Sequence, residues 1–124
     1  MNRGDIILIT FPFSDLTSTK IRPALILSPK EMSEQDFVAA LISSNTARPL
    51  SKTDYLLSTY DPDFSGTGLK INSVFRMAKI HNLRKSLAKR RLGKVNAQLM
   101  KELEKKLYEA LGLKQQTKKK NLPK

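Results

Sequence analysis

The sequence predicts a mainly β fold, a small barrel or sandwich, followed by one C-terminal helix. Short apolar runs rich in β-branched residues recur through the first two thirds of the chain, and turn residues separate them. After these runs, leucines repeat every fourth residue, which is the spacing of one helix face. A chain of 124 residues is long enough to bury one core, so a single domain is expected.

The predicted strands begin close to the N-terminus. The first two cover residues 6–11 and 23–27, with Pro12 closing the first and a polar connection over 14–21 between them. Further strands are expected at residues 37–43, 53–58 and 73–80, with a loop rich in Pro, Gly and Asp at 60–68. For residues 84–96 a short helical turn and a last strand both remain open.

The helix is predicted from Asn96 onward, because Leu99, Leu103, Leu107 and Leu111 form one apolar stripe. The Asn96 side chain can cap the first turn, and glycine at position 112 can close the last one. We expect the stripe to pack against the sheet. Residues 114–124 carry five lysines and no acidic residue, and we expect them to form a basic, disordered tail.

The positive charge is concentrated in the last third of the chain. The formal net charge is +12, of which residues 1–81 contribute +1 and residues 82–113 contribute +6. This asymmetry indicates an anionic partner, with nucleic acid first and an acidic protein or a membrane surface next. A solvated helix face with a basic tail explains the same charge equally well.

Cysteine content and segment lengths exclude several classes. The chain has no cysteine, which excludes disulfides and thiolate metal sites and suits a cytoplasmic location. Its first residues contain no signal-peptide pattern, and no apolar segment reaches the length of a membrane-spanning helix. A Gly-rich phosphate loop, a nucleophile elbow and a zinc-ligand pattern are all absent.

Two stretches resemble a known family. GDIILITFPFSDL (residues 4–16) followed by KIRPALILS (20–28), together with residues 67–113, is similar to the MazF/PemK toxins of type II toxin–antitoxin systems. The resemblance implies an SH3-like β-barrel with a C-terminal helix, with residues 1–113 as the toxin domain and 114–124 as the tail. It also implies a homodimer, a metal-independent endoribonuclease that needs no cofactor, and an acidic antitoxin as partner.

Arg22 is the principal catalytic candidate. It matches the arginine of the family's Arg-Pro motif, and Pro23 biases it toward an extended backbone at the start of the second strand. RNA can be cut without a metal because its 2′-hydroxyl can attack the adjacent phosphorus. A planar guanidinium meets two phosphate oxygens at once and suits the stabilisation of the charge that develops there. Without the resemblance, Arg22 would be read as an exposed arginine at a strand start.

The second catalytic group is ambiguous in the sequence. The family often has a threonine near the end of the third strand, and Ile42 stands at that position here, followed by Ser43 and Ser44. Because alternate residues of a strand face opposite sides, Ile42 and Ser43 cannot fill the same role in one register. Either Ser43 supplies the hydroxyl through a shifted register, or both serines merely end the strand.

Further residues are predicted to hold single-stranded RNA rather than to react. Lys20 is expected to bind the RNA backbone. Three residues with hydroxyl groups and one arginine are expected to contact the RNA as well: Thr19, Ser44, Ser73 and Arg76. His81, the only histidine, is read as a surface or structural residue. The sequence Asp61-Pro62-Asp63 is read as a turn rather than a magnesium site.

Two other functions stay open. A toxin of the same barrel could poison a protein target such as gyrase without cutting anything, and Ile42 at the threonine position keeps this alternative open. A non-catalytic RNA-binding barrel that uses the lysine-rich tail is the other alternative.

Overall fold

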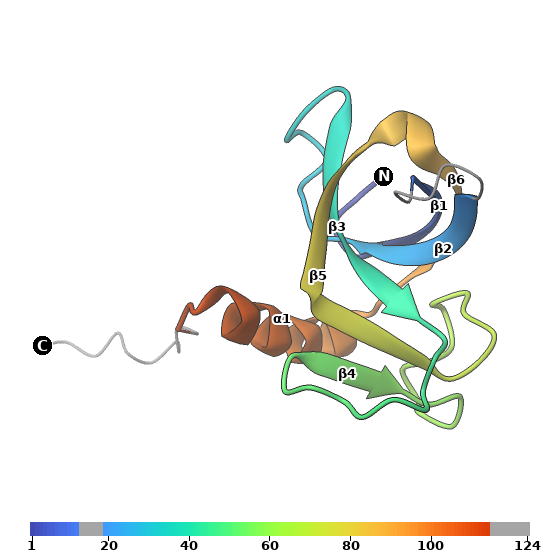
Figure 1. The fold of residues 1–124 in the computed structure, drawn as a ribbon, viewed down its shortest axis with the longest axis vertical. Coiled ribbons are helices and arrows are strands. Elements are labelled where there is room, and N and C mark those ends of the chain that lie inside the picture. Colours follow the sequence, from blue (N-terminus) through green and yellow to red (C-terminus); the bar gives the residue numbers. More distant parts are fainter. Residues whose placement is uncertain (13–18, 115–124) are drawn as a thin grey trace, which may run out of the picture.

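The computed structural model describes residues 1–12 and 19–114. Within these residues, six strands form one antiparallel sheet in the order β4-β5-β3-β2-β1-β6, followed by one α-helix (Figure 1). The mainly β fold with a C-terminal helix is therefore confirmed. The elements are β1 (Asp5–Pro12), β2 (Thr19–Ile26), β3 (Asp36–Ser43), β4 (Asp54–Leu57), β5 (Ser73–Arg84), the 3-10 turn η1 (Lys85–Leu87), β6 (Ala88–Lys94) and α1 (Ala97–Leu111).

The second strand begins earlier than predicted. Thr19, Lys20 and Ile21 already pair with β1, opposite Pro12, Phe11 and Thr10. Arg22 therefore lies inside β2, opposite Ile9, and the expectation that it opens the strand was wrong. The polar character of the connection hid these pairings, because ladder hydrogen bonds do not depend on apolar side chains. Residues 13–18, the rest of that connection, lie outside the described residues.

Residues 84–96 contain both of the structures that the sequence left open. β5 runs to Arg84, the short turn η1 follows, and β6 returns along β1. Figure 1 shows that β5 bends sharply along its length, where its pairing with β3 shifts register between Ala40 and Leu41. A β-bulge of this kind bends the strand and lets a sheet curl.

The sheet buries both of its faces. Ile6 and Leu25, which pair across β1 and β2, belong to one apolar cluster with the helix, whereas the adjacent pair Ile7 and Ala24 belongs to a second cluster. The first cluster lies between the sheet and α1, which packs against β5 and β4 (Figure 1). Burial on both faces explains why these strands read as continuous apolar runs rather than alternating ones.

The helix forms where it was predicted, but only three of the four leucines of its stripe are buried, because Leu111 in the last turn is exposed. Leu99, Leu103 and Leu107 are buried against the sheet, and the side chain of Asn96 accepts a hydrogen bond from the Leu99 amide at 2.8 Å. Gly112 ends the helix in the left-handed conformation, with φ of 71°. α1, the single α-helix of the described residues, is neither long nor apolar enough to cross a membrane.

Candidate functional site

A pocket of about 250 Å³ opens where four neighbouring strands meet one loop. The loop covers residues 68–71 and leads into β5, whose first residue Ser73 also lines the pocket, and the four strands are β3, β2, β1 and β6. Its lining combines apolar side chains, cations and hydroxyls: Leu8, Arg22, Pro23, Ile42, Ser43, Ser44, Gly68, Leu69, Lys70, Ile71, Ser73, Arg90 and Leu92. A larger hollow of about 820 Å³ runs along α1, but it is lined mainly by charged residues of the helix and its end and brings together none of the predicted site residues.

The pocket gathers four of the seven residues predicted from the sequence, namely Arg22, Ser43, Ser44 and Ser73. They come from three different strands or strand ends, and the fold brings them together because β2 and β5 both pair with β3. This convergence could not be read from their spacing along the chain.

Arg22 is exposed, and no carboxylate of the described residues lies within ion-pair distance of its guanidinium. Three other arginines do have such partners: Arg3 with Glu104, Arg76 with Asp54, and Arg91 with Asp5. An arginine that lines a pocket without an acidic partner is available to an anion from solution.

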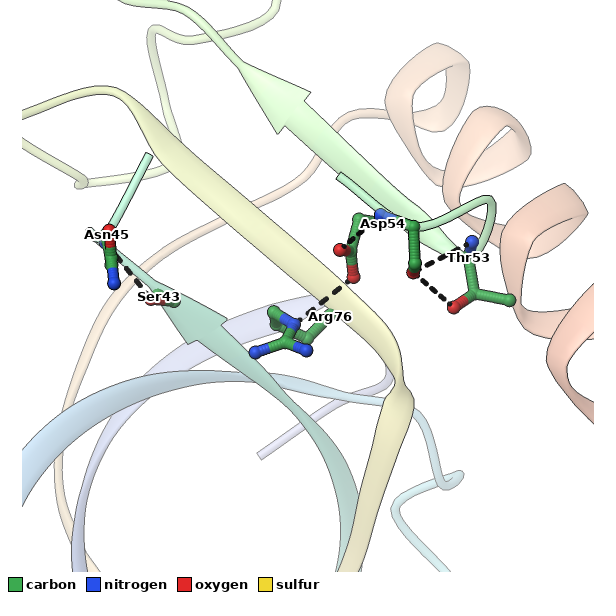
Figure 2. A network of polar contacts seen from close by, with 6 residues as sticks. Ser43, Asn45, Thr53, Asp54 and Arg76 are labelled. Atoms are coloured by element: carbon green, nitrogen blue, oxygen red, sulfur yellow. Dashed lines mark hydrogen bonds and ion pairs between the residues drawn. The ribbon is translucent and has the colours of Figure 1, made fainter. Parts of the chain in front are cut away.

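Ser43 ends β3, and its hydroxyl oxygen accepts a hydrogen bond from the Asn45 amide at 3.0 Å (Figure 2). A hydroxyl has one proton to donate besides its acceptor positions, so this bond leaves the Ser43 proton available. The Ser73 hydroxyl instead donates its proton to the Ile71 carbonyl at 2.8 Å. Ile42 is 2% exposed and packs in the core beside Phe75, with which it pairs.

Arg76 does not line the pocket. Its Nε lies 3.2 Å from Oδ1 of Asp54, a carboxylate that is itself buried and whose Oδ2 accepts the Ser51 amide at 2.9 Å (Figure 2). This pair ties β4 to β5. The assignment of Arg76 to RNA binding stays a prediction, and its observed contact is structural.

The two remaining predicted residues, Thr19 and Lys20, lie at the start of β2. Lys20 is exposed, pairs with Phe11 and does not line the pocket. The backbone of Thr19 belongs to β2, but its side chain lies outside what the structure describes. Their predicted contacts with RNA remain predictions.

The sequence missed two cations of this site, Arg90 on β6 and Lys70 in the covering loop. Arg90 stands in residues 84–96, whose structure the sequence left open, and Lys70 stands between the predicted loop at 60–68 and the predicted strand at 73–80. Among the residues that the structure describes, the lining contains three cationic side chains and no carboxylate. Ligand pockets for whole small molecules span roughly 300–1,000 Å³, so this smaller pocket fits part of a longer molecule better than a whole free ligand.

The residues read as structural behave accordingly. Asp61 accepts the Asp63 amide at 2.8 Å, which is a turn, and the described residues contain no cluster of metal-ligating side chains. His81 is exposed on β5, where its ring meets Phe11 edge-on with centroids 5.6 Å apart, and it does not line the pocket.

The fold and the pocket define a small curled β-sheet protein with a cationic, hydroxyl-lined site. Comparison with protein families gives a match over residues 2–111 to the PemK-like, MazF-like toxins of type II toxin–antitoxin systems. The chain belongs to this family. A search of the curated proteins finds no match.

Solved structures share the fold at low sequence identity. An endoribonuclease from a mycobacterial species, in complex with its cognate antitoxin, superposes with a TM-score of 0.70 at 22% identity, covering 94% of this chain and 99% of the other. The Mycobacterium tuberculosis toxin MazF-mt6 gives 0.69 at 21% identity, covering 90% and 99%. MazF from Deinococcus radiodurans gives 0.68 at 20% identity, covering 91% and 97%.

Proposed function

We propose that this chain is an endoribonuclease toxin that cuts single-stranded RNA, mRNA in the cell, without a metal ion. The observation that carries the proposal is that Arg22 and Ser43 line one pocket, in which the described part of the chain places cations and no carboxylate. Family membership and the endoribonuclease named among the similar structures support it.

The proposed reaction is an internal transfer at phosphorus. The ribose 2′-oxygen attacks the adjacent phosphorus and loses its proton to a base, while the bond from phosphorus to the 5′-oxygen breaks and that oxygen takes up a proton. The products are a 2′,3′-cyclic phosphate and a 5′-hydroxyl. No oxidant or further reactant is required, so the protein must only stabilise charge and move protons.

Arg22 is assigned to the charge on the non-bridging phosphate oxygens, which grows in the transition state. Removal of one well-aimed donor of this kind costs roughly 3–4 kcal/mol in other enzymes. An arginine is a poor base, because its guanidinium keeps its proton throughout the physiological pH range. Ser43 is therefore assigned to assist proton transfer, since its hydroxyl proton is free to be donated while its oxygen accepts from Asn45.

The expected partners follow from the same site. An acidic antitoxin would cover the cationic pocket, because carboxylates can stand in for phosphates and steer association. Similar toxins are recorded in complex with antitoxins, among them MazE with MazF of Deinococcus radiodurans. We propose a homodimer of a toxin domain at residues 1–113, acting in the cytoplasm where mRNA is found, with 114–124 as an electrostatic accessory.

The test compares RNA with DNA under metal-free conditions. The purified protein is incubated in EDTA with a single-stranded RNA and with an all-deoxy copy of it. We expect cuts in the RNA alone, because DNA lacks the attacking hydroxyl. Arg22→Ala should abolish cutting with an unchanged unfolding transition, whereas Arg84→Ala, which removes an equal charge from an exposed site outside the pocket, should retain it.

Two other results would overturn the proposal. Tight RNA binding without cuts would indicate a non-catalytic RNA-binding protein. Neither binding nor cuts would favour a toxin directed at a protein such as gyrase, the alternative that Ile42 keeps open.

A further inference from the structure

Two arginines, not one, face the pocket. Arg22 lies on β2 and Arg90 on β6, on opposite sides of β1, and both line the same cavity. We propose that Arg90 binds the phosphate next to the one that is cut, so that the site grips two consecutive phosphates of a strand. This inference rests on the proposed nuclease function.

The strand register carries the first step. Leu8 of β1 pairs with Pro23 on one side and with Arg90 on the other, so these residues form one row across three strands. Paired residues of neighbouring strands project to the same face of a sheet. All three line the pocket, which confirms that the row faces it. Strands lie about 4.8 Å apart, so the backbones of β2 and β6 are about 10 Å apart at this row.

Two bulges in β6 lie on either side of the pair of residues Arg90 and Arg91. The pairing with β1 shifts register on each side of Ile7 and Leu8, so that Leu92 and Lys89 are left without ladder partners. Bulges re-aim the side chains beside them. Between these two shifts stand only Arg91 and Arg90, opposite Ile7 and Leu8 respectively, and of the two only Arg90 lines the pocket.

The two neighbouring arginines differ in what neutralises them. The Nε atom of Arg91 lies 3.2 Å from Oδ1 of the buried Asp5, so its charge has an internal partner. Arg90 has no carboxylate within ion-pair distance among the described residues, and in this it matches Arg22. Within the described part of the chain, both guanidiniums are therefore available to anions from solution.

The apolar residues of the row separate the two arginines, so we assign a different phosphate to each. Leu8 lies between Pro23 and Arg90 in this row and its side chain has no hydrogen-bonding group, whereas Arg22, the neighbour of Pro23 on β2, pairs with Ile9 and stands beside the row. A nucleic-acid strand that runs from Arg22 to Arg90 would place one phosphate at each arginine and the sugar between them over Leu8. Arg90 is therefore a binding residue, and Arg22 remains the one at the reacting phosphorus.

Binding of an all-deoxy strand tests this independently of cutting. Arg90→Ala should weaken the affinity roughly ten-fold, the effect of losing one hydrogen bond to a charged group. The slope of log K against log salt should become shallower by about 0.7, the share of one phosphate on a single strand. Lys89→Ala is the matched control, because it removes the same charge one residue away on β6 without touching the pocket. Equal effects of the two variants would overturn the inference and leave only general attraction.

A substrate with one neutral phosphate analogue identifies which phosphate Arg90 contacts. A methylphosphonate is placed beside the mapped cut, first on one side and then on the other. On one of the two sides it should raise KM with little change in kcat, and combining it with Arg90→Ala should add nothing further. Additive losses on both sides would overturn the inference even if the RNA is still cut. If the wild-type chain cuts nothing but the all-deoxy result holds, the nuclease proposal fails and the phosphate site stands.

Discussion

Gly93 of β6 lies so close to Gly66 that a Cβ atom added to Gly93 would be 2.2 Å from the Gly66 carbonyl oxygen. A second glycine repeats the contact one residue along, since a Cβ on Gly68 would be 2.1 Å from the carbonyl oxygen of Leu92. The Lys94 amide closes the junction by donating to the Gly66 carbonyl at 2.9 Å. These contacts hold the loop of residues 66–69 against β6 and so form one wall of the pocket.

Gly93→Ala should lower the free energy of unfolding by about 1–3 kcal/mol, because overpacking against backbone cannot be relieved by a side-chain rotation. Chemical denaturation measures the change. Gly66→Ala serves as control, because its Cβ would meet nothing within 4 Å and only its positive φ of 93° is strained. A smaller loss for Gly93→Ala than for Gly66→Ala would contradict the tight junction.

Arg22→Lys tests whether the site needs the planar guanidinium of arginine or only its positive charge. Lysine keeps the positive charge but cannot meet two phosphate oxygens with one rigid plane. We expect the single-turnover cutting rate to fall by about 10²–10³-fold, as for the loss of one aimed donor, with affinity for an uncleavable strand changed much less. Arg84→Lys should have no effect on either quantity. Full activity of Arg22→Lys would reduce the role of Arg22 to general electrostatics.

Ser43→Ala separates the two interpretations that the sequence left open. If the hydroxyl moves a proton or binds the leaving oxygen, the cutting rate should fall by about 10²-fold, the lower end of general acid–base effects. The pH profile of the rate should also change. Ser44→Ala removes a neighbouring hydroxyl of the same pocket and should cost less. Equal rates for the wild type and Ser43→Ala would mean that Ser43 only ends β3.

Tyr55 should influence stability at alkaline pH. Its pKa is raised above the usual value, first by burial and then by the negative charges of Asp61, Glu102 and Asp63. The folded state therefore holds the phenol proton more tightly than the unfolded state does. This stabilisation is complete below the unfolded pKa of about 10 and is lost as the pH rises through the folded pKa.

Denaturation at neutral pH and at about pH 11 measures this effect in the wild type and in Tyr55→Phe. We expect the phenylalanine variant to lose less stability between the two pH values. Comparison of the ultraviolet pH titrations of the wild type and of Tyr55→Phe isolates the contribution of the Tyr55 phenol. An equal alkaline loss in both proteins would refute the assignment.

The sequence was sufficient for the fold because its strands are apolar on both faces and its helix has one regular stripe. It was insufficient for the site, which depends on register. Arg90 stood in an unassigned basic segment, and only its pairing with Leu8 puts it beside the residues of β2. Arg76 was read as free to bind RNA, whereas its partner Asp54 is 22 residues away in the chain. Such long-range pairings leave no local pattern.

The position of Arg22 within β2 has a thermodynamic consequence. Its backbone is fixed by the ladder with β1 before any nucleic acid arrives, so the protein loses little conformational entropy there on binding. The ordering cost falls instead on the flexible polynucleotide. Calorimetry on strands that are already stacked should therefore give a less unfavourable binding entropy than calorimetry on unstacked strands of equal length and charge.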